Sequence, residues 1–214
     1  MIALEEAAEA LARGHLVVIP TDTVYGLASR PDRPEATARL FAAKRRPLDL
    51  ELPVLVPSID AAERVALIDG GARALMEAFW PGPLTVVLPR AASSTGWELG
   101  GDRSTVGLRR PRHLLALALL ERTGPLAVTS ANLSGHPTPS SCEALTDLFG
   151  DAVAVYLCQD QPLQGLPSTV VDMAHGDADV LRAGTITKEE IEGVLRRGRA
   201  DGGSQEGSGP KARC

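Results

Sequence analysis

Short apolar runs alternate with amphipathic stretches along most of the chain, a pattern typical of strands alternating with helices. Leu4 to Arg13 places apolar residues on one face and is followed by Gly14, which predicts an opening helix with a glycine stop. His15 to Pro20 is a short apolar run ended by proline and predicts a buried strand. Thr21 to Leu27 then reads as a polar loop. Similar apolar runs predict strands at Leu52 to Val56, Leu84 to Leu88, Thr105 to Arg109, Leu126 to Thr129, Val153 to Leu157, Ser168 to Asp172 and Val180 to Arg182.

Helical periodicity fills the intervals between these runs. Helices are predicted at Pro34 to Lys44, Asp60 to Ile68, Ala72 to Phe79 and His113 to Arg122. The fourth is apolar nearly all round, so we expect it to be buried. Thr187 and Glu190 form a capping box for a last helix that reaches about Arg196. Together these elements predict one α/β domain over residues 1–196 around a mixed sheet, and residues 197–214, which lack periodicity, predict a disordered tail.

Charge and composition narrow the possible partners. The formal net charge is −5 and aromatic residues make up 3% of the chain. Tight, autonomous binding of nucleic acid usually needs a basic face or aromatic stacking platforms, so it is not favoured. No stretch approaches the roughly 20 apolar residues of a membrane span, and the N-terminus does not resemble a signal peptide. We therefore expect a cytoplasmic protein with no membrane partner.

Cysteine and histidine do not form a metal-binding or disulfide pattern. The three cysteines include no C-x-x-C pair, and their odd number argues against a disulfide framework. Cys142 and Cys158 are expected to act as small hydrophobic residues. The four histidines are scattered, so no metal-ligating residues are predicted.

Polar residues cluster just after several of the predicted strands, which is where open α/β sheets usually hold ligands. The clusters are Thr21-Asp22-Thr23, Lys44-Arg45-Arg46, Thr105 with Arg109, Ser130-Ala131-Asn132, Ser168-Thr169 and Arg182. Each has a simpler interpretation, as turn residues, helix-terminal cations, caps or surface ion pairs. Their shared position at strand ends favours a common cleft, and its cations would suit a phosphate-bearing ligand.

The same segments, in the same order, resemble the YrdC/TsaC family of threonylcarbamoyl-AMP synthases. The matching words are V-I-P-T-D-T-V-Y-G-L (Val18 to Leu27), K-R-R-P (Lys44 to Pro47), W-P-G-P-L-T (Trp80 to Thr85), T-V-G-L-R-R-P (Thr105 to Pro111), T-S-A-N-L-S-G (Thr129 to Gly135), S-T-V-V-D (Ser168 to Asp172) and L-R-A-G (Leu181 to Gly184). They span roughly Gly14 to Ile186, most of the chain.

The resemblance implies a twisted mixed β-sheet flanked by helices in a single domain, and a specific reaction. L-threonine and bicarbonate form a carbamate, which attacks the α-phosphate of ATP and releases pyrophosphate. ATP would enter with Mg²⁺, and the product would pass to a tRNA threonylcarbamoyl transferase complex, with a possible weak contact to tRNA. Such a reaction depends on positioning and on neutralising phosphate charge, which fits the absence of a nucleophile-elbow motif.

The resemblance also assigns residues by motif position. The L-threonine contacts are Thr23, Arg109, Val128 and Ser168, with Arg109 on the α-carboxylate. The ATP contacts are Lys44, Arg46, Thr105, Ser130, Asn132, Thr138 and Arg182. Of these, Lys44, Arg46, Ser130 and Asn132 are the expected catalytic residues.

Two departures from the family pattern lie in one loop. Leu52 stands where the family usually has a basic or amide residue before proline, and two extra residues lie between Pro47 and Pro53. These departures predict that one phosphate contact is either lost or supplied by Arg45. Two other functions stay open: a YrdC-like carbamoyl-transfer enzyme that uses carbamoyl phosphate, and a non-catalytic RNA-binding module.

Overall fold

Nine strands form one mixed sheet in the computed structural model, which describes residues 2–159, 163 and 165–202. The strands are β1 (Val17–Ile19), β2 (Gly26–Ser29), β3 (Val54–Leu55), β4 (Leu84–Pro89), β5 (Thr105–Arg109), β6 (Leu126–Ser130), β7 (Val155–Tyr156), β8 (Thr169–Asp172) and β9 (Asp179–Arg182). Their spatial order is β7-β1-β2-β6-β3-β5-β4-β8-β9. The pairs β1/β7, β3/β5 and β4/β8 are parallel, and the others are antiparallel.

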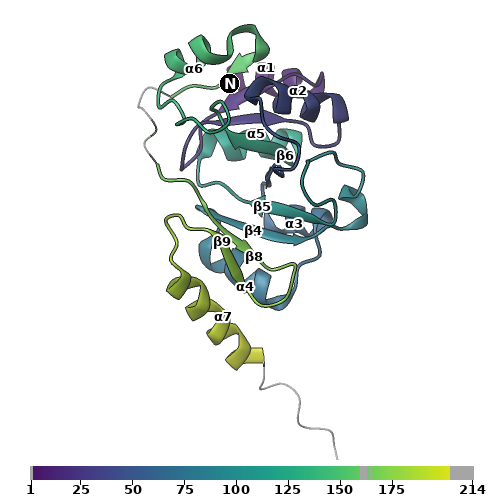
Figure 1. The fold of residues 1–214 in the computed structure, drawn as a ribbon, viewed down its shortest axis with the longest axis vertical. Helices are drawn as coiled ribbons and strands as arrows, with labels where there is room; N and C mark the ends of the chain where they lie inside the picture. The colour runs from purple at the N-terminus through teal and green to yellow at the C-terminus, as the bar shows by residue number, and fades with distance from the viewer. Residues whose placement is uncertain (1, 160–162, 164, 203–214) are drawn as a thin grey trace, which may run out of the picture.

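Helices pack on both faces of this sheet. They are α1 (Ile2–Ala12), α2 (Pro34–Lys44), α3 (Ile59–Val65), α4 (Gly70–Phe79), α5 (Leu114–Thr123), α6 (Cys142–Phe149) and α7 (Lys188–Gly202), with single 3₁₀ turns at Ala92–Ser94 and Gly150–Ala152. Figure 1 shows α1, α2 and α6 toward one end of the molecule and α4 and α7 toward the other. None of the helices in the described residues has the length and apolarity that a membrane span requires.

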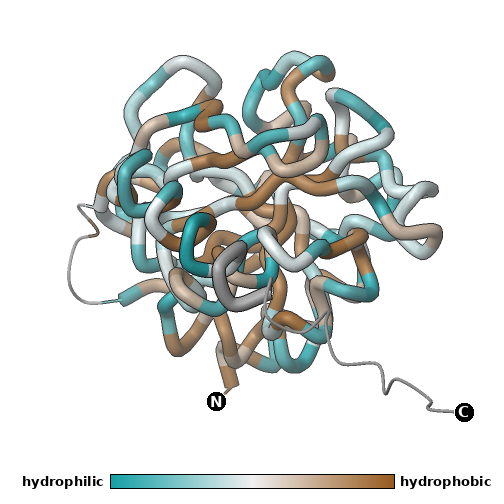
Figure 2. The backbone as a smooth tube through the Cα atoms, turned by 90° about the horizontal axis from the view of Figure 1, so that it is seen from below, coloured by the Kyte–Doolittle hydropathy of each residue, from teal (hydrophilic) through white to brown (hydrophobic). Residues whose placement is uncertain are grey.

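The core is divided by the sheet into two apolar clusters. The smaller cluster joins α1 and α5 to one face through residues such as Leu11, Leu119 and Val17. The larger cluster lies on the other face, where α2, α3, α4, α6 and α7 contribute side chains such as Leu40 and Leu75. Figure 2 shows the hydrophobic segments running through the interior, with hydrophilic segments common in the outer loops. Alternate residues of β1, β2, β3, β6 and β7 supply the two clusters, as a pleated sheet allows, whereas β4, β5, β8 and β9 supply the larger cluster alone.

Most elements predicted from periodicity are present. Helix α2 has the predicted bounds, and Gly14 takes a positive φ of 80° after α1, a conformation that favours glycine. The capping box is also present, since the Thr187 amide donates to Glu190 Oε2 (2.8 Å) and the Glu190 amide donates to Thr187 Oγ1 (3.2 Å). Helix α7 then continues to Gly202, beyond the predicted end near Arg196. The rest of the predicted tail, residues 203–214, lies outside the described residues.

Two elements and one burial pattern differ from the predictions. Strand β2 lies partly within the predicted loop; its sequence G-L-A-S is short, yet it is fully buried between β1 and β6. Helix α6 was not predicted, although Ser141 caps it by accepting from the Ala144 amide (3.3 Å). The prediction that α5 is wholly buried is wrong at its start, where Leu114 is 85% exposed.

The expectation that Cys142 and Cys158 act as small hydrophobic residues is wrong. The structure joins them as a disulfide, with their Cα atoms 5.7 Å apart. That separation lies within the usual range for such a bridge. Cys142 begins α6 and Cys158 follows β7, so the pairing depends on how two separate segments pack. Sequence spacing alone does not contain that information.

Candidate functional site

A cavity of about 530 Å³ lies over the sheet, and residues of β2, β3, β4, β5, β6, β8 and β9 contribute to its lining. On the face that α1 and α5 cover, strands β1 and β6 present apolar residues such as Ile19 and Leu126. On the same face, β4 and β5 present Thr85, Gly107 and Arg109 to the cavity. Covering polar groups with an apolar helix would cost their hydration. Helices α1 and α5 therefore cover the apolar part of this face, and the polar part is left open as a cavity.

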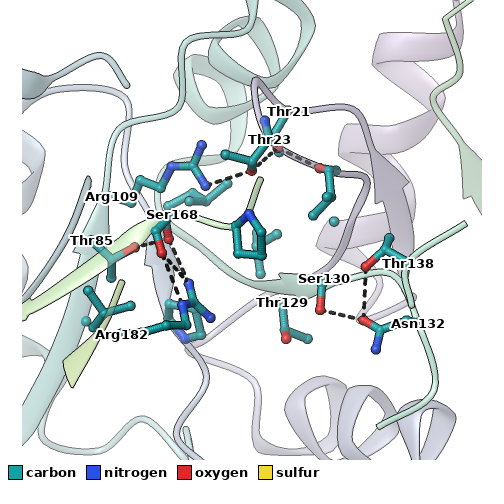
Figure 3. Close-up of a pocket in the computed structure, with 18 of the residues that line it drawn as sticks. Thr21, Thr23, Thr85, Arg109, Thr129, Ser130, Asn132, Thr138, Ser168 and Arg182 are labelled. Atoms are coloured by element: carbon teal, nitrogen blue, oxygen red, sulfur yellow. Dashed lines mark hydrogen bonds between the residues drawn. The ribbon is translucent and has the colours of Figure 1, made fainter. Parts of the chain in front are cut away.

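Two groups of polar residues lie at opposite ends of the cavity, as Figure 3 shows. The Arg109 end contains Thr23, Thr85, Arg109, Ser168 and Arg182, and the Ser130 end contains Arg46, Ser130, Asn132 and Thr138. The register of the sheet explains the separation. Leu55 of β3 pairs with Arg109 of β5. Extending the antiparallel β3–β6 register places Ser130 opposite residue 51, four residues before Leu55 along the same strand direction. Gly107 lies between these two positions. Because glycine has no side chain, the main chain itself forms the floor of the cavity there.

The Arg109 end is built around a buried ion pair. Arg109 donates to Asp22 Oδ1 (2.6 Å), to Thr23 Oγ1 (3.0 Å) and to the Gly82 carbonyl (3.0 Å). Asp22 also accepts from the Arg112 amide (2.9 Å). Burial lowers the pKa of Arg109, and Asp22 opposes that shift. A guanidinium has more N–H donors than these three contacts use, so Arg109 keeps donors for a ligand.

Arg182 and Ser168 complete this end. Arg182 donates to the Ser168 carbonyl (2.9 Å) and to Ser168 Oγ (2.9 Å), and Ser168 Oγ is also 2.9 Å from Thr85 Oγ1. These residues lie on or next to β4, β8 and β9, which are neighbours in the sheet. Ser168 immediately precedes β8, and its hydroxyl is therefore held in one position by side chains from two other strands, β4 and β9.

Thr21 and Thr23 have different roles although they are two residues apart. Thr21 Oγ1 donates to the Val24 carbonyl (2.6 Å) and accepts from the Thr23 amide (3.2 Å). Thr21 is thus a turn residue, as the simpler interpretation of this cluster proposed. Thr23 instead presents its hydroxyl to Arg109. Gly165 packs against this turn, where an added Cβ would lie 2.2 Å from the Thr23 carbonyl oxygen.

A short loop after β6 forms the Ser130 end. Ser130 Oγ lies 2.5 Å from Asn132 Oδ1, and Thr138 Oγ1 lies 3.4 Å from the same oxygen. The Asn132 amide nitrogen donates to the carbonyls of Leu133 and His136, at 2.7 Å each. These bonds orient the Asn132 side chain and hold the loop that carries it.

Lys44 supports this loop from behind. Its ammonium donates to the carbonyl oxygens of Ser130 and Asn132, the latter at 2.7 Å, and to Asn132 Oδ1 at 3.2 Å. The residue is only 1% exposed, and it is not among the described residues that line the cavity. Burial, followed by the charge of Arg46, lowers the pKa of Lys44 to about 7.

Arg46 lines the cavity directly. It donates to the backbone carbonyls of Leu50 (3.1 Å) and Glu51 (2.9 Å), which fold the following loop around it. Burial lowers its pKa, and so does the charge of Arg182. The two guanidinium groups therefore influence one another across the cavity.

The remaining predicted residues are placed as follows. Val128 lines the cavity, where its Cγ1 would lie 2.5 Å from a Cβ added to Gly26. Thr105 is buried, but it is not among the described lining residues. Arg45 is exposed, takes a positive φ of 51° and is likewise absent from that set, while Leu52 is fully buried in the core. The structure thus gives Arg45 no place in the cavity lining.

Glu51 is a cavity residue that the sequence analysis did not identify. It lies in the loop with two extra residues, and its carboxylate approaches Arg90 at 3.5 Å. Burial raises the pKa of Glu51 to about 7, and the charge of Arg90 opposes the shift. The unusual length of the loop was the available signal, but the strand register that turns Glu51 inward is visible only in the fold.

Comparison with known proteins identifies the family. The Sua5/YciO/YrdC family model, described as "Telomere recombination", matches residues 9–184. A Mycobacterium tuberculosis protein with the provisional name threonylcarbamoyl-AMP synthase is 44% identical over 88% of this chain and 87% of its own length. The threonylcarbamoyl-AMP synthase of Bacillus subtilis is 36% identical over 90% of this chain and 56% of its own.

Solved structures agree with this relationship. Pyrococcus abyssi Sua5 in complex with L-threonine matches with a TM-score of 0.80 and 35% identity, over 89% of this chain and 56% of that protein. Escherichia coli YciO matches with a TM-score of 0.80 and 26% identity, over 88% of this chain and 92% of that protein. The family model covers well over half of the chain, as do these relatives, and the chain therefore belongs to the Sua5/YciO/YrdC family.

Proposed function

We propose that this chain is a threonylcarbamoyl-AMP synthase, which forms threonylcarbamoyl-adenylate and pyrophosphate from L-threonine, bicarbonate and ATP. The similarity to proteins of that name supports the proposal, as does the similarity to Sua5 bound to L-threonine. The observation that carries it is the single cavity with two polar ends, one built on a charge-paired arginine and the other on Arg46 and a structured loop.

L-threonine is proposed to bind at the Arg109 end. Its carboxylate would accept from the free donors of Arg109, and its hydroxyl or amino group would meet Thr23 and Ser168. Val128 would close the pocket beside the side-chain methyl. Because Asp22 neutralises much of the charge on Arg109, this end suits an amino acid with no net charge.

ATP is proposed to bind at the Ser130 end, where Arg46, Ser130, Asn132 and Thr138 would contact it, and to extend across the cavity to Arg182. Lys44 would position the loop of Ser130 and Asn132 through its bonds to their carbonyls. Thr105 shares the face of Gly107 on β5 and is buried outside the described lining, and it stays a proposed ATP contact. In the described lining residues the only carboxylate is Glu51, which fits Mg²⁺ held largely by phosphate oxygens and water. When bound, that ion would neutralise charge on the phosphates.

The proposed chemistry needs no enzyme nucleophile. The threonine nitrogen adds to bicarbonate and water leaves, which produces an N-carboxylate. One oxygen of that carboxylate then bonds to the α-phosphorus, while the bond to the β-phosphate oxygen breaks and pyrophosphate departs. Arg46 and Arg182 would stabilise the charge that develops on the phosphates, and the two ends would align the reactants.

The surroundings of the reaction are also proposals. We propose that residues 1–196 form the catalytic domain, that the product passes to a tRNA threonylcarbamoyl transferase complex, and that contact with tRNA is weak. Because the acceptor is tRNA, we propose a cytoplasmic location.

The proposal is tested by incubating the purified protein with L-threonine, bicarbonate and ATP–Mg²⁺, then measuring pyrophosphate and the adenylate by mass spectrometry. Omitting any one substrate should abolish the product. Pyrophosphate release that does not depend on L-threonine would contradict the proposal. Product from carbamoyl phosphate instead of bicarbonate would favour the carbamoyl-transfer alternative, and salt-sensitive RNA binding without turnover would favour the RNA-binding module.

A further inference from the structure

Glu51 lines the cavity, and the β3–β6 register puts it at the level of Ser130. Residues 51, 53 and 55 alternate in direction with the buried residues between them, and Glu51, Pro53 and Leu55 all line the cavity. The backbone carbonyl of Glu51 also accepts from Arg46. The main chain of Glu51 therefore lies beside the guanidinium proposed to meet the phosphates, while its carboxylate approaches Arg90.

A buried arginine accounts for only part of the Glu51 carboxylate. Arg90 approaches Oε1 at 3.5 Å, a long contact. The Arg90 guanidinium is already engaged, because it donates to the carbonyls of Thr105 (2.5 Å) and Trp97 (2.9 Å). Among the described residues, no hydrogen bond reaches Glu51 Oε2, and the Glu51 side chain is 20% exposed to solvent. One oxygen is thus available to the cavity.

This position conflicts with a bare triphosphate. Arg46, Arg109 and Arg182 make the described lining cationic, and Glu51 is its one carboxylate. Negative groups a few ångströms apart repel strongly in a partly desolvated site. A cation placed between the Glu51 carboxylate and the triphosphate would be attracted to both, which turns the net repulsion into attraction. Arg90 lies behind the carboxylate, so a cation in front of it has to come with the ligand.

We propose that Glu51 contacts the magnesium ion of the ATP–Mg²⁺ complex at the Ser130 end, directly or through one water molecule. The proposal rests on the proposed function for the identity of the nucleotide. One carboxylate together with substrate phosphates is a usual environment for Mg²⁺ in nucleotide sites. A purely structural role, as the counter-ion of Arg90, is the competing interpretation.

The two roles differ in how nucleotide affinity depends on the metal. We would measure ATP binding by calorimetry with Mg²⁺ and with EDTA, for the native protein, Glu51→Gln and the control Asp49→Asn. Asp49 is exposed in the same loop and does not belong to the described lining. In the native protein and the control, Mg²⁺ should raise ATP affinity strongly. In Glu51→Gln that enhancement should shrink on the order of tenfold, because the metal loses a ligand, while affinity for metal-free ATP should rise.

Each other outcome is informative. If Glu51→Gln lowers both affinities by the same factor and lowers Tm, Glu51 only balances Arg90 and the inference is wrong. If Glu51→Gln does not fold, Glu51→Ala replaces it, since it also removes the carboxylate; a metal enhancement equal to that of the native protein would again reject the inference. If the native protein makes the adenylate but the enhancement is unchanged in Glu51→Gln, the inference alone fails. If the native protein does not bind ATP in either condition, the proposed function fails with it.

Discussion

The two ends of the cavity hold their cations in different ways. At the Arg109 end, the guanidinium is paired with the carboxylate of Asp22 at 2.6 Å. At the Ser130 end, Arg46 and Lys44 bond mainly to neutral oxygens, the backbone carbonyls of Leu50, Glu51, Ser130 and Asn132. Arg109 is thus paired directly with a carboxylate, whereas no salt bridge among the described residues joins Arg46 or Lys44 to one.

This difference matches the two proposed substrates. L-threonine is a zwitterion with no net charge, and a guanidinium that is already paired with Asp22 can bind its carboxylate with less attraction for other anions. A triphosphate carries several negative charges. Cations that are bonded only to neutral carbonyls keep their net positive charge, which attracts the phosphates. The contrast therefore predicts that substitutions at each end affect one substrate and spare the other.

The largest effect is expected for Arg109→Ala. L-threonine binding should weaken by about 2–4 kcal/mol, because a charge-assisted contact is lost and Asp22 is left without its partner. Calorimetry with L-threonine measures the change, and Arg110→Ala is the matched control, since Arg110 donates to the Pro57 carbonyl away from the cavity. An unchanged threonine affinity in Arg109→Ala would show that L-threonine does not bind at the Arg109 end.

A second test concerns the buried ammonium of Lys44, whose pKa is lowered to about 7 from 10.5. Between these values the unfolded chain binds more protons at this residue than the folded chain does. Stability should therefore rise with pH from about 7 toward 10, by at most about 1.4 kcal/mol per pH unit from this group.

Thermal melting across that pH range compares the native protein with Lys44→Met and with the exposed control Lys188→Met. Lys44→Met should melt at a lower temperature and lose part of the upward slope. A slope shared by all three proteins would mean that Lys44 does not titrate in this window.

Arg46→Gln sharpens the comparison at the Ser130 end. ATP affinity should fall on the order of tenfold, with a weaker dependence on salt, because one cation facing the phosphates is removed. L-threonine affinity should stay within about twofold. The exposed neighbour Arg45→Gln serves as the control. Equal losses in both variants would point to a general charge effect rather than to a contact.

The smallest effect is expected for Thr138→Val. Its hydroxyl lies 3.4 Å from Asn132 Oδ1, so it adds little to a side chain held by stronger bonds. ATP affinity should fall by about twofold. Thr146→Val, on the exposed side of α6, is the control. A loss of tenfold or more would show that Thr138 contacts the nucleotide itself.

Much of this arrangement could be predicted from sequence, because the informative residues lie at or next to the ends of apolar strands. Thr23, Arg109, Ser168 and Arg182 were expected in one cleft and line one cavity. Strand periodicity supports such a prediction, since it places strand ends together before any side chain is positioned.

Side-chain direction could not be predicted in the same way. Lys44 turns toward the carbonyls of a loop 86 residues away, so its role depends on a contact that no local pattern records. Glu51 points inward only because the extended loop rejoins β3 in a particular register. Strand β2 and the pairing of Cys142 with Cys158 likewise depend on long-range packing rather than on local propensity.

Gly107 gives the middle of the cavity an unusual property. A Cβ at this position would lie 3.3 Å from Thr85 Cγ2, so the floor there is main chain with almost no spare room. Under the proposed function, the carbamate and the α-phosphate would meet above this bare segment. The spacing between the two binding ends would then be set by the backbone of one strand. Substitutions of side chains at either end would leave that spacing unchanged.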